Sequence, residues 1–443
     1  MKKYNNYKPS GVEWLGEIPE HWEVKKLKFL GNIYAGINGK KGDDFSKEYS
    51  EGIKSFIPFT NICNNFKIDK NQYQYVKIDE KENQNRVLKN DILFLMSSET
   101  LDDIAKNSIY LEDDKELYLN SFCKGFRISK QNVNAEFVNY LFLSTTYRNY
   151  FSLVGRGFTR INLKQEFIND AYTLLPKLEE QTTIAHFLDD KTTKIDQAIA
   201  IKQKQIELLK ERRQILIHKA VTRGLNDKVK LKDSGVEWIG EIPEHWEVKR
   251  LKYVANIVLG KMLCNEDKGN YKLKPYLKSK NIQWLNVEIE SVDEMWFSEK
   301  EMLDYRLKKG DLILSEGGEV GKTCIWNNEL EECYIQNSAH KVTVYDENIS
   351  EYYLYIFYTI GKFGVFDSIV NRVSIGHLTK DKLSNIEIIN PPKEEQTQIA
   401  EFIETATTKI STAISLKEQE IEKLKEYKMS LIDGVVTAKI KVF

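Results

Sequence analysis

The chain of 443 residues contains the same half twice, and this repeat limits its possible folds more than any other feature. A block from Ser10 to Lys28 recurs from Ser234 to Lys252 with only two substitutions. Solenoid repeats have periods of a few tens of residues, whereas the distance from Ser10 to Ser234 spans half of this chain. A period this long indicates a duplicated domain.

A second repeated block follows at a different offset. It runs from Glu179 to Thr222 and recurs from Glu394 to Thr437, and this offset is smaller than that of the first block. The segments between the blocks share little sequence, and the second of them is the shorter. We therefore expect a constant frame that carries two variable inserts. The expected parts are a globular segment 1–176, a helix 177–224, a globular segment 225–391 and a helix 392–443.

The second block has the pattern of a long helix with a heptad seam. Both copies place basic residues in the same seam positions, Lys202 with Lys417 and Arg213 with Lys428. A polar seam residue fixes register at a cost in stability, so we expect the two helices to pack on each other in one alignment. A helix of about 40 residues is about 60 Å long, which suits a spacer. The alternative is that each helix lies on its own globular domain and its basic residues extend to solvent. The expected seam comprises Leu188, Ile195, Ile199, Lys202, Ile206, Leu209, Arg213 and Leu216 in the first copy, and Ile403, Ile410, Ile414, Lys417, Ile421, Leu424, Lys428 and Leu431 in the second.

The variable inserts mix strand and helix signals. Short apolar runs at 53–59, 91–96 and 310–315, bounded by turn residues, predict strands, whereas 135–147 and 350–360 place apolar residues at helical spacing. The opening of each repeat predicts a turn-rich segment that leads into a strand, near 23–27 in the first copy. We expect an α+β fold with two globular domains, each followed by a long helix.

Composition excludes several classes of protein. The five cysteines are odd in number and form no Cys-x-x-Cys pair, so neither a disulfide framework nor a zinc site is expected. No apolar run approaches the roughly 18 residues of a membrane span, and residues 1–9 lack the apolar core of a signal peptide, which favours a cytoplasmic protein. The net charge of −1 does not indicate binding of nucleic acid over the whole surface. Acidic residues gather in the helical segments, however, which leaves basic loops elsewhere.

Catalytic motifs are weak or incomplete. The segment 317–323 resembles a phosphate loop, but Glu316 stands where the first glycine is needed, and the residues that follow predict a strand instead of a helix. Asn390-Pro391-Pro392 resembles an amino methyltransferase loop, but Lys393 stands in place of the aromatic residue that would stack on the base. The six histidines form no metal-binding spacing. We expect no catalytic residue, no metal and no cofactor.

Together these blocks resemble the specificity subunit of type I restriction-modification enzymes over nearly the whole chain. The most specific piece is Glu-Glu-Gln-x-x-Ile-Ala at the start of each helix, Glu179 to Ala185 and Glu394 to Ala400. The resemblance implies two target recognition domains that each read one half of a bipartite asymmetric DNA site. It also implies that the helices form an antiparallel coiled coil that sets the gap and docks methyltransferase subunits, two in number.

The resemblance further implies a non-catalytic subunit that acts in phage defence. Its complex would be a type I site-specific deoxyribonuclease and adenine-specific DNA methyltransferase, and restriction or translocase subunits would join through that complex.

Candidate DNA-reading residues lie in loops that carry basic and amide side chains together. Arginine suits guanine edges, asparagine and glutamine suit adenine, and lysine mostly holds phosphate. The two arginine-bearing loops, around Arg160 and Arg372, precede the helices by similar spacings. The candidates are Lys40, Lys41, Arg156, Thr159 and Arg160 in the first half, and Lys322, Gln336, Asn337, His340, Lys341, Arg372, Ser374 and His377 in the second.

A different class of function remains open. The chain could be a scaffold whose coiled coil spaces two protein-binding domains without DNA specificity. Near-zero net charge and abundant aromatic residues such as Tyr73 and Tyr75 favour it. Salt-dependent, sequence-selective DNA binding would decide between the two.

Overall fold

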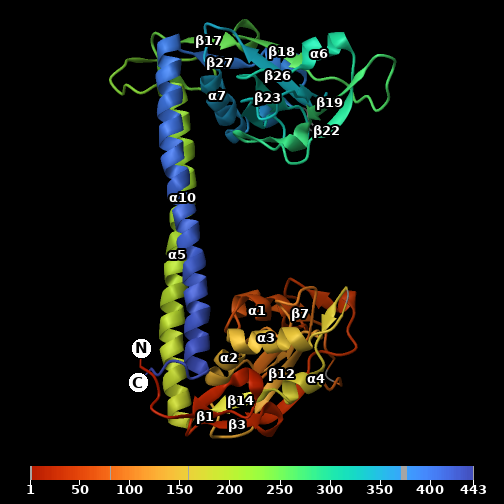
Figure 1. Cartoon of the computed structure of the whole chain (residues 1–443), viewed down its shortest axis with the longest axis vertical. Coiled ribbons are helices and arrows are strands. Elements are labelled where there is room, and N and C mark those ends of the chain that lie inside the picture. The colour runs from red at the N-terminus through yellow and green to blue at the C-terminus, as the bar shows by residue number, and fades with distance from the viewer. Residues whose placement is uncertain (1, 80, 158, 371–376, 443) are drawn as a thin grey trace. The chain divides into compact units, whose positions relative to one another are not determined.

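The computed structural model describes residues 2–79, 81–157, 159–370 and 377–442. The chain divides into two compact units, and Figure 1 traces the chain through them by colour. Unit 1 lies within residues 1–202 and 418–443, and unit 2 comprises 203–417. This division passes through both long helices, so each unit holds one globular domain and a part of each helix. The four-part division expected from the sequence stays a prediction.

The domain of unit 1 is built on a four-stranded sheet of order β10-β8-β12-β4. In β8, Ile92 and Phe94 pack with the helices, whereas Leu93 and Leu95 pack toward a second sheet of order β11-β6-β7-β5. Successive strand residues face opposite sides, so a strand covered on both faces is apolar throughout. The elements of this domain are β1 (Tyr7–Pro9), β2 (Glu17–Pro19), β3 (Glu23–Lys26), β4 (Gly31–Ala35), β5 (Phe45–Ser46), β6 (Lys54–Ile57), α1 (Phe59–Asn64), β7 (Gln74–Val76), β8 (Ile92–Leu95), β9 (Ser97–Ser98), β10 (Asn107–Ile109), β11 (Leu117–Leu119), β12 (Cys123–Ile128), α2 (Ala135–Leu143), α3 (Thr145–Val154), β13 (Ile161–Asn162), α4 (Gln165–Asn169) and β14 (Tyr172–Leu175).

The domain of unit 2 repeats this plan with a different sequence. Its main sheet has the order β24-β23-β26-β18, and in β23 Leu312 and Leu314 pack with the helices while Ile313 faces the other core. Two inserts without clear sequence similarity therefore form the same sheet. The elements are β15 (Leu231–Asp233), β16 (Glu241–Pro243), β17 (Glu247–Arg250), β18 (Ala255–Leu259), β19 (Lys272–Leu277), β20 (Ile282–Gln283), β21 (Asn286–Val287), β22 (Asp293–Phe297), α6 (Glu299–Tyr305), β23 (Leu312–Ser315), β24 (Thr323–Ile325), β25 (Tyr334–Ile335), β26 (Ala339–Val344), α7 (Ser350–Lys362), α8 (Val365–Ile369), α9 (Lys380–Ser384) and β27 (Glu387–Asn390).

The local sequence predictions agree with these elements. The strands predicted near 23–27, 53–59, 91–96 and 310–315 are β3, β6, β8 and β23. The predicted helix 135–147 is two helices, because Ser144 is extended (ψ 150°) and its hydroxyl donates a hydrogen bond to Leu141 O. The residues after the segment that resembles a phosphate loop form strand β24, as the sequence predicts.

The two repeated blocks are joined by one hydrogen-bonded arrangement in each unit. Trp22 is fully buried, and its Nε1 donates to Glu180 Oε1 at 3.1 Å; in unit 2, Trp246 donates to Glu395 at 3.0 Å. Gln181, next to Glu180, is also buried, and its amide group donates to Pro176 O and accepts from Asn134 N at the start of α2. In each unit, the tryptophan of the first repeated block is therefore hydrogen-bonded to the Glu-Glu-Gln motif of the second block.

The two long helices pair with each other, as the heptad pattern predicts, and they run in antiparallel directions, as the family resemblance implies. They are α5 (Leu178–Arg223) and α10 (Lys393–Val436), the two longest ribbons in Figure 1. In unit 1, Lys202 Nζ lies 2.5 Å from Glu420, and Lys428 Nζ lies 2.7 Å from both carboxylate oxygens of Asp196. Residue numbers rise along α5 as those of their partners on α10 fall, which defines the antiparallel pairing. This confirms the α+β fold with paired helices.

All of the expected seam positions are buried or half-buried. Three of the four basic seam residues, Lys202, Lys417 and Arg213, are half-buried. Lys428 is buried, and its Nζ lies 3.8 Å from the centroid of the Phe66 ring. Burial lowers the pKa of Lys428, while its hydrogen bond to Asp196 opposes that shift. The role of the individual seam residues in register stays a prediction. The buried seam positions are Leu188, Ile195 and Ile206 of α5 and Ile403, Ile410, Ile421, Lys428 and Leu431 of α10; Ile199, Leu209, Leu216, Ile414 and Leu424 are half-buried.

Candidate nucleic-acid interface

The arginine-bearing loop of unit 1 is a tight hairpin between α3 and β13. Its ends pair through Arg156 and Asn162, and β13 continues onto β9 with Ile161 opposite Ser98. Gly157 has a φ of 150°, and a Cβ at this position would lie 1.8 Å from Arg160 O, so the turn requires glycine. The hairpin leaves the side chain of Arg160 exposed.

Arg160 does not stand alone. Its guanidinium lies 4.7 Å from the centroid of the Phe122 ring, which is 42% exposed. Phe122 belongs to the turn before β12, where Asn120 Oδ1 accepts a hydrogen bond from Phe122 N. Stacking on an aromatic face holds a guanidinium in a fixed plane, as base recognition by arginine requires.

Asn120 and Phe122 were not predicted from the sequence, although residues of the equivalent turn in unit 2 were. The turn that contains Gln336 precedes β26 and occupies the same place in the sheet as the turn before β12. The sequence does contain a signal for these turns. Gly36 and Gly260 are separated by the same number of residues as the two copies of the first repeated block. A Cβ on them would lie 2.1 Å from Asn120 O and 2.4 Å from Gln336 O. Paired glycines thus mark where both turns approach a neighbouring strand.

In unit 2 the candidate residues gather around this turn. Gln336 and Asn337 are half-buried, and Gln336 Oε1 accepts a hydrogen bond from the hydroxyl of Ser338. His377 is exposed and lies beside Gly317. The ammonium group of Lys322 is less available for DNA, because its Nζ lies 2.8 Å from Glu319 and also contacts Gln283.

The remaining candidates of unit 1 differ in accessibility. Lys41 and Thr159 are exposed. Arg156 is exposed, but its Nη1 donates to Leu153 O at the end of α3 and to Gly155 O. The ammonium of Lys40 forms an ion pair with Glu82 and is largely covered. Their contact with DNA stays a prediction, with Lys40 the least available.

Two candidates of unit 2 are wrong as surface readers. His340 is fully buried, and its Nε2 lies 2.5 Å from Leu378 O. Lys341 is 7% exposed, and its ammonium donates to Asp304 O and Arg306 O. Both side chains belong to β26, a central strand covered on both faces, so they lie in the interior of the domain. Arg372 and Ser374 lie outside the described residues.

The burial of His340 predicts a pH dependence of stability. Burial lowers the pKa of His340 below its ordinary value of about 6.5; the hydrogen bond to Leu378 O opposes this shift, and the charge of Lys380 adds to it. Above that pH neither the folded nor the unfolded chain protonates this residue, so its contribution is fully present. As the pH falls further, His340 is protonated in the unfolded chain but not in the folded chain. The free energy of unfolding then falls by up to about 1.4 kcal/mol per pH unit. We expect His340→Gln to show a shallower loss than the wild type in denaturation series between pH 7.5 and 5. Since His218 titrates in both proteins, equal slopes would contradict this assignment.

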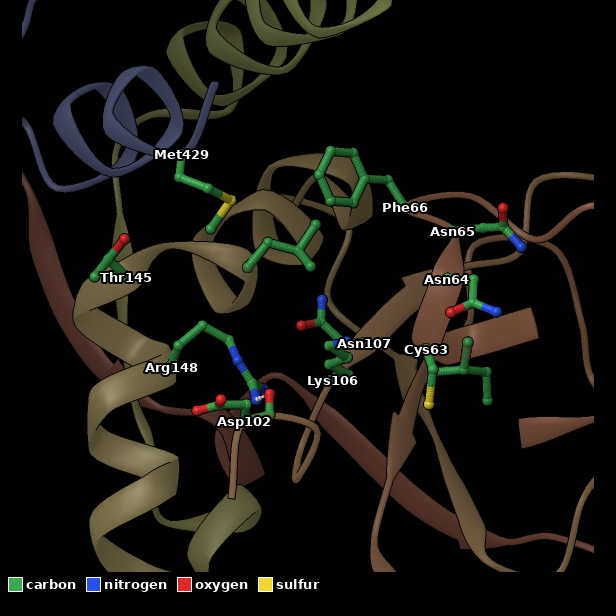
Figure 2. A pocket seen from close by; sticks show the side chains of 12 residues that line it. Cys63, Asn64, Asn65, Phe66, Asp102, Lys106, Asn107, Thr145, Arg148 and Met429 are labelled. Carbon is green, nitrogen blue, oxygen red and sulfur yellow. Dashed lines mark hydrogen bonds between the residues drawn. The ribbon is translucent and has the colours of Figure 1, made fainter. Parts of the chain in front are cut away.

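A pocket of 340 Å³ in unit 1 has a described lining that does not suit an active site (Figure 2). Its wall contains the thiol of Cys63, whose pKa is raised by burial, and no histidine. Arg148 donates through Nη2 to Asp102 O and Ile104 O, and burial lowers its pKa to about 10. A nucleophile needs an adjacent base or a lowered pKa, and this lining supplies neither to Cys63. Within the described residues, no cluster of three or more His, Cys, Asp or Glu suits a metal ion, and no helix is long and apolar enough to cross a membrane.

Comparison with known proteins settles the family. The type I restriction modification DNA specificity domain matches this chain twice, over residues 19–211 and 243–426. The chain belongs to the family of type I restriction-modification specificity subunits. It is 29% identical to the putative type I restriction enzyme MjaX specificity subunit of Methanocaldococcus jannaschii, across 99% of this chain and 98% of that protein. It is 23% identical to the EcoKI specificity subunit of Escherichia coli, across 68% of this chain and 62% of that protein.

Solved specificity subunits share its fold. A chain from a study of complex assembly in a type I R-M system superposes with a TM-score of 0.71 at 14% identity, covering 95% of this chain and 98% of that chain. The HsdS subunit of Thermoanaerobacter tengcongensis gives a TM-score of 0.55 at 15% identity, covering 96% and 98%. These matches agree with two domains joined to paired helices. DNA binding follows from membership of the family.

Proposed function

We propose that this specificity subunit reads a bipartite asymmetric DNA site, one half with each domain, and docks methyltransferase subunits. In this assembly it supplies no catalytic group. Adenine methylation and DNA cleavage belong to the methyltransferase and restriction subunits that join the complex.

The observation that carries the proposal is the pair of equivalent turns at the ends of β12 and β26. The same sheet presents Asn120 and Phe122 in unit 1 but Gln336 and Ser338 in unit 2. The scaffold repeats while the side chains at its edge differ, which suits two half-sites of different sequence. One domain with a few base contacts, each worth about 1–3 kcal/mol, gives limited specificity, so two domains are needed for a rare site.

Support for docking comes from apolar residues of α5 outside the seam. Leu208 is 51% exposed and Ile215 is 59% exposed, and their heptad spacing places them on one face of the helix. Repeated exposure of large apolar side chains favours burial against another chain. A helix of the methyltransferase subunit would cover them.

The experiment is to express this chain with its methyltransferase and to map methylated adenines in the host genome. We expect one two-part motif with a constant gap, and co-purification of the methyltransferase with this chain. A purified complex that never prefers one duplex over another would instead support the scaffold with two protein-binding domains.

Replacing Arg160 with alanine tests the unit 1 interface. We expect affinity for the methylated sequence to fall about 5- to 150-fold, because a good arginine-base contact is worth about 1–3 kcal/mol. Binding is measured with the assembled complex on cognate and scrambled duplexes at several salt concentrations.

Lys89→Ala is the matched control, since Lys89 is exposed just before β8, at the opposite end of that strand from the Arg160 hairpin. It should leave affinity for the cognate duplex unchanged. Unchanged cognate binding by Arg160→Ala would remove this hairpin from the interface.

A further inference from the structure

In unit 1 a lysine from the variable insert pairs with carboxylates of α2 and α5. Lys67 Nζ lies 2.6 Å from Asp189 Oδ2 and 3.6 Å from Glu136 Oε2. The hydroxyl of Tyr140 donates to the other oxygen of Asp189 at 2.5 Å. Two carboxylates and a tyrosine thus form a socket that is occupied by an ammonium group of the same chain.

Unit 2 contains the same socket, displaced along the chain by the offset of the second repeated block. Glu351, Tyr355 and Glu404 are the counterparts of Glu136, Tyr140 and Asp189, and Tyr355 OH donates to Glu404 Oε2 at 2.6 Å. Equivalent backbone hydrogen bonds at the start of α2 and α7 fix this correspondence, since Asn134 N and Ile349 N each donate at 2.8 Å to the glutamine of the repeated motif.

The socket of unit 2 lacks the ammonium. Among the residues that the structure describes, none forms an ion pair with Glu351, Glu401 or Glu404. Two adjoining pockets of 490 and 410 Å³ share Glu351, Tyr355 and Glu404 in their walls. We call this space the α7–α10 groove and define it by Glu351, Tyr355, Glu401 and Glu404.

The difference arises from the variable inserts. In unit 1 Lys67 lies beside Ile109 of β10. In unit 2 the segment along the matching strand β24 contributes the apolar side chain of Leu285 to the pocket, and Leu285 N donates to Thr323 O. Leu285 therefore supplies no ammonium group to these carboxylates, unlike Lys67 in unit 1.

Arg213 does not replace the missing lysine. It lines the same pocket, but it forms no ion pair with a described carboxylate, and its Nε is buried without a hydrogen-bond partner. Its counterpart Lys428 pairs with Asp196, whereas the residue that corresponds to Asp196 is Ser411. The groove therefore keeps an excess of negative charge from three glutamates.

We propose that the α7–α10 groove of unit 2 receives a basic side chain of the methyltransferase subunit, in the position that Lys67 occupies in unit 1. This inference rests on the docking part of the proposed function. The groove is open, acidic and part apolar, and unit 1 shows that this set of side chains binds an ammonium group. Because unit 1 is already filled, the two methyltransferase subunits meet unequal surfaces, and only the one at unit 2 makes this contact.

The test measures stepwise binding of purified methyltransferase subunit to the full chain at several salt concentrations. In Glu351→Gln with Glu404→Gln, the amide oxygen at 404 still accepts from Tyr355, so the fold is preserved while the charge is removed. We expect one of the two binding steps to weaken about tenfold and to lose part of its salt dependence. Leu285→Lys, which supplies an internal ammonium, should weaken the same step.

Glu136→Gln with Asp189→Asn is the matched control in unit 1, and it should leave both binding steps unchanged. Hydrogen exchange of the unit 2 helices checks that each variant is folded. If the wild type binds the methyltransferase and both binding steps are unchanged in Glu351→Gln with Glu404→Gln, the groove assignment is wrong. The proposed function is then unaffected. Absence of any methyltransferase binding by the wild type would contradict docking itself.

Discussion

Replacing Glu180 with alanine is expected to lower the free energy of unfolding of unit 1 by about 3 kcal/mol. Glu180 accepts hydrogen bonds from Trp22 Nε1 at 3.1 Å and Tyr4 OH at 2.8 Å, and its other oxygen lies 2.8 Å from His21 Nε2. Trp22 and Tyr4 are buried, so the donors that face Glu180 would lose this acceptor away from solvent. An unpaired buried donor costs about 1–3 kcal/mol. The loss should be large because one carboxylate serves three side chains.

Hydrogen exchange of peptides from each unit measures this loss locally. Glu179→Ala is the control, because Glu179 lies in the same first turn of α5 but is exposed. Loss of its favourable interaction with the helix dipole should cost about 0.5 kcal/mol. Glu395→Ala should destabilise unit 2 by less than Glu180→Ala destabilises unit 1, since Glu395 bonds only His245 and Trp246 among the described residues. Equal small effects of Glu179→Ala and Glu180→Ala would show that the hydrogen bonds of Glu180 contribute little to the stability of unit 1.

Reversing the charge of Lys428 is the second large effect. Lys428→Glu would place a carboxylate against Asp196 and over the face of Phe66, in a position whose side chain is only 11% exposed. Like charges and the negative face of an aromatic ring both repel it, and burial of an unpaired charge adds to the cost. We expect the pairing of α10 with α5 in unit 1 to weaken by about 3 kcal/mol, measured by exchange of the α10 amides.

Two further variants separate charge from packing. Lys428→Met keeps the apolar stem and should cost about 1 kcal/mol, because Asp196 is 54% exposed and can return to water. Asp196→Lys combined with Lys428→Glu should recover part of the loss by restoring an ion pair of opposite polarity. If the double variant is as unstable as Lys428→Glu alone, the ion pair does not stabilise the pairing of α5 with α10.

The helices and the frame were predictable because their signals are local and periodic. Apolar residues at three- and four-residue spacing define one face of a helix whatever the rest of the chain does. The strands β8 and β23 were equally clear, since apolar runs bounded by turn residues leave little alternative. The break at Ser144 was not predicted, because a single extended residue does not disturb the helical pattern around it.

The candidate interface was only partly predictable. Around β26, the run from Gln336 to Lys341 has the composition of a polar loop, so all its basic and amide residues were predicted to read DNA. Only its first part is a turn, and His340 lies in the interior. Phe122 was missed because its partner Arg160 is far away in sequence, and stacking leaves no local pattern.

The sequence by itself determined the repeat, the long helices and the mixed α+β domains. Each of these depends on spacing along the chain, which the sequence states directly. Only the tertiary structure decided which polar side chains face solvent and which sockets are filled. His340 and Lys341 lie in the interior, where distant backbone carbonyls accept their hydrogen bonds, and the socket of unit 1 is occupied because Lys67 reaches it from its insert. Such partners are brought together by packing, so no spacing along the chain predicts them.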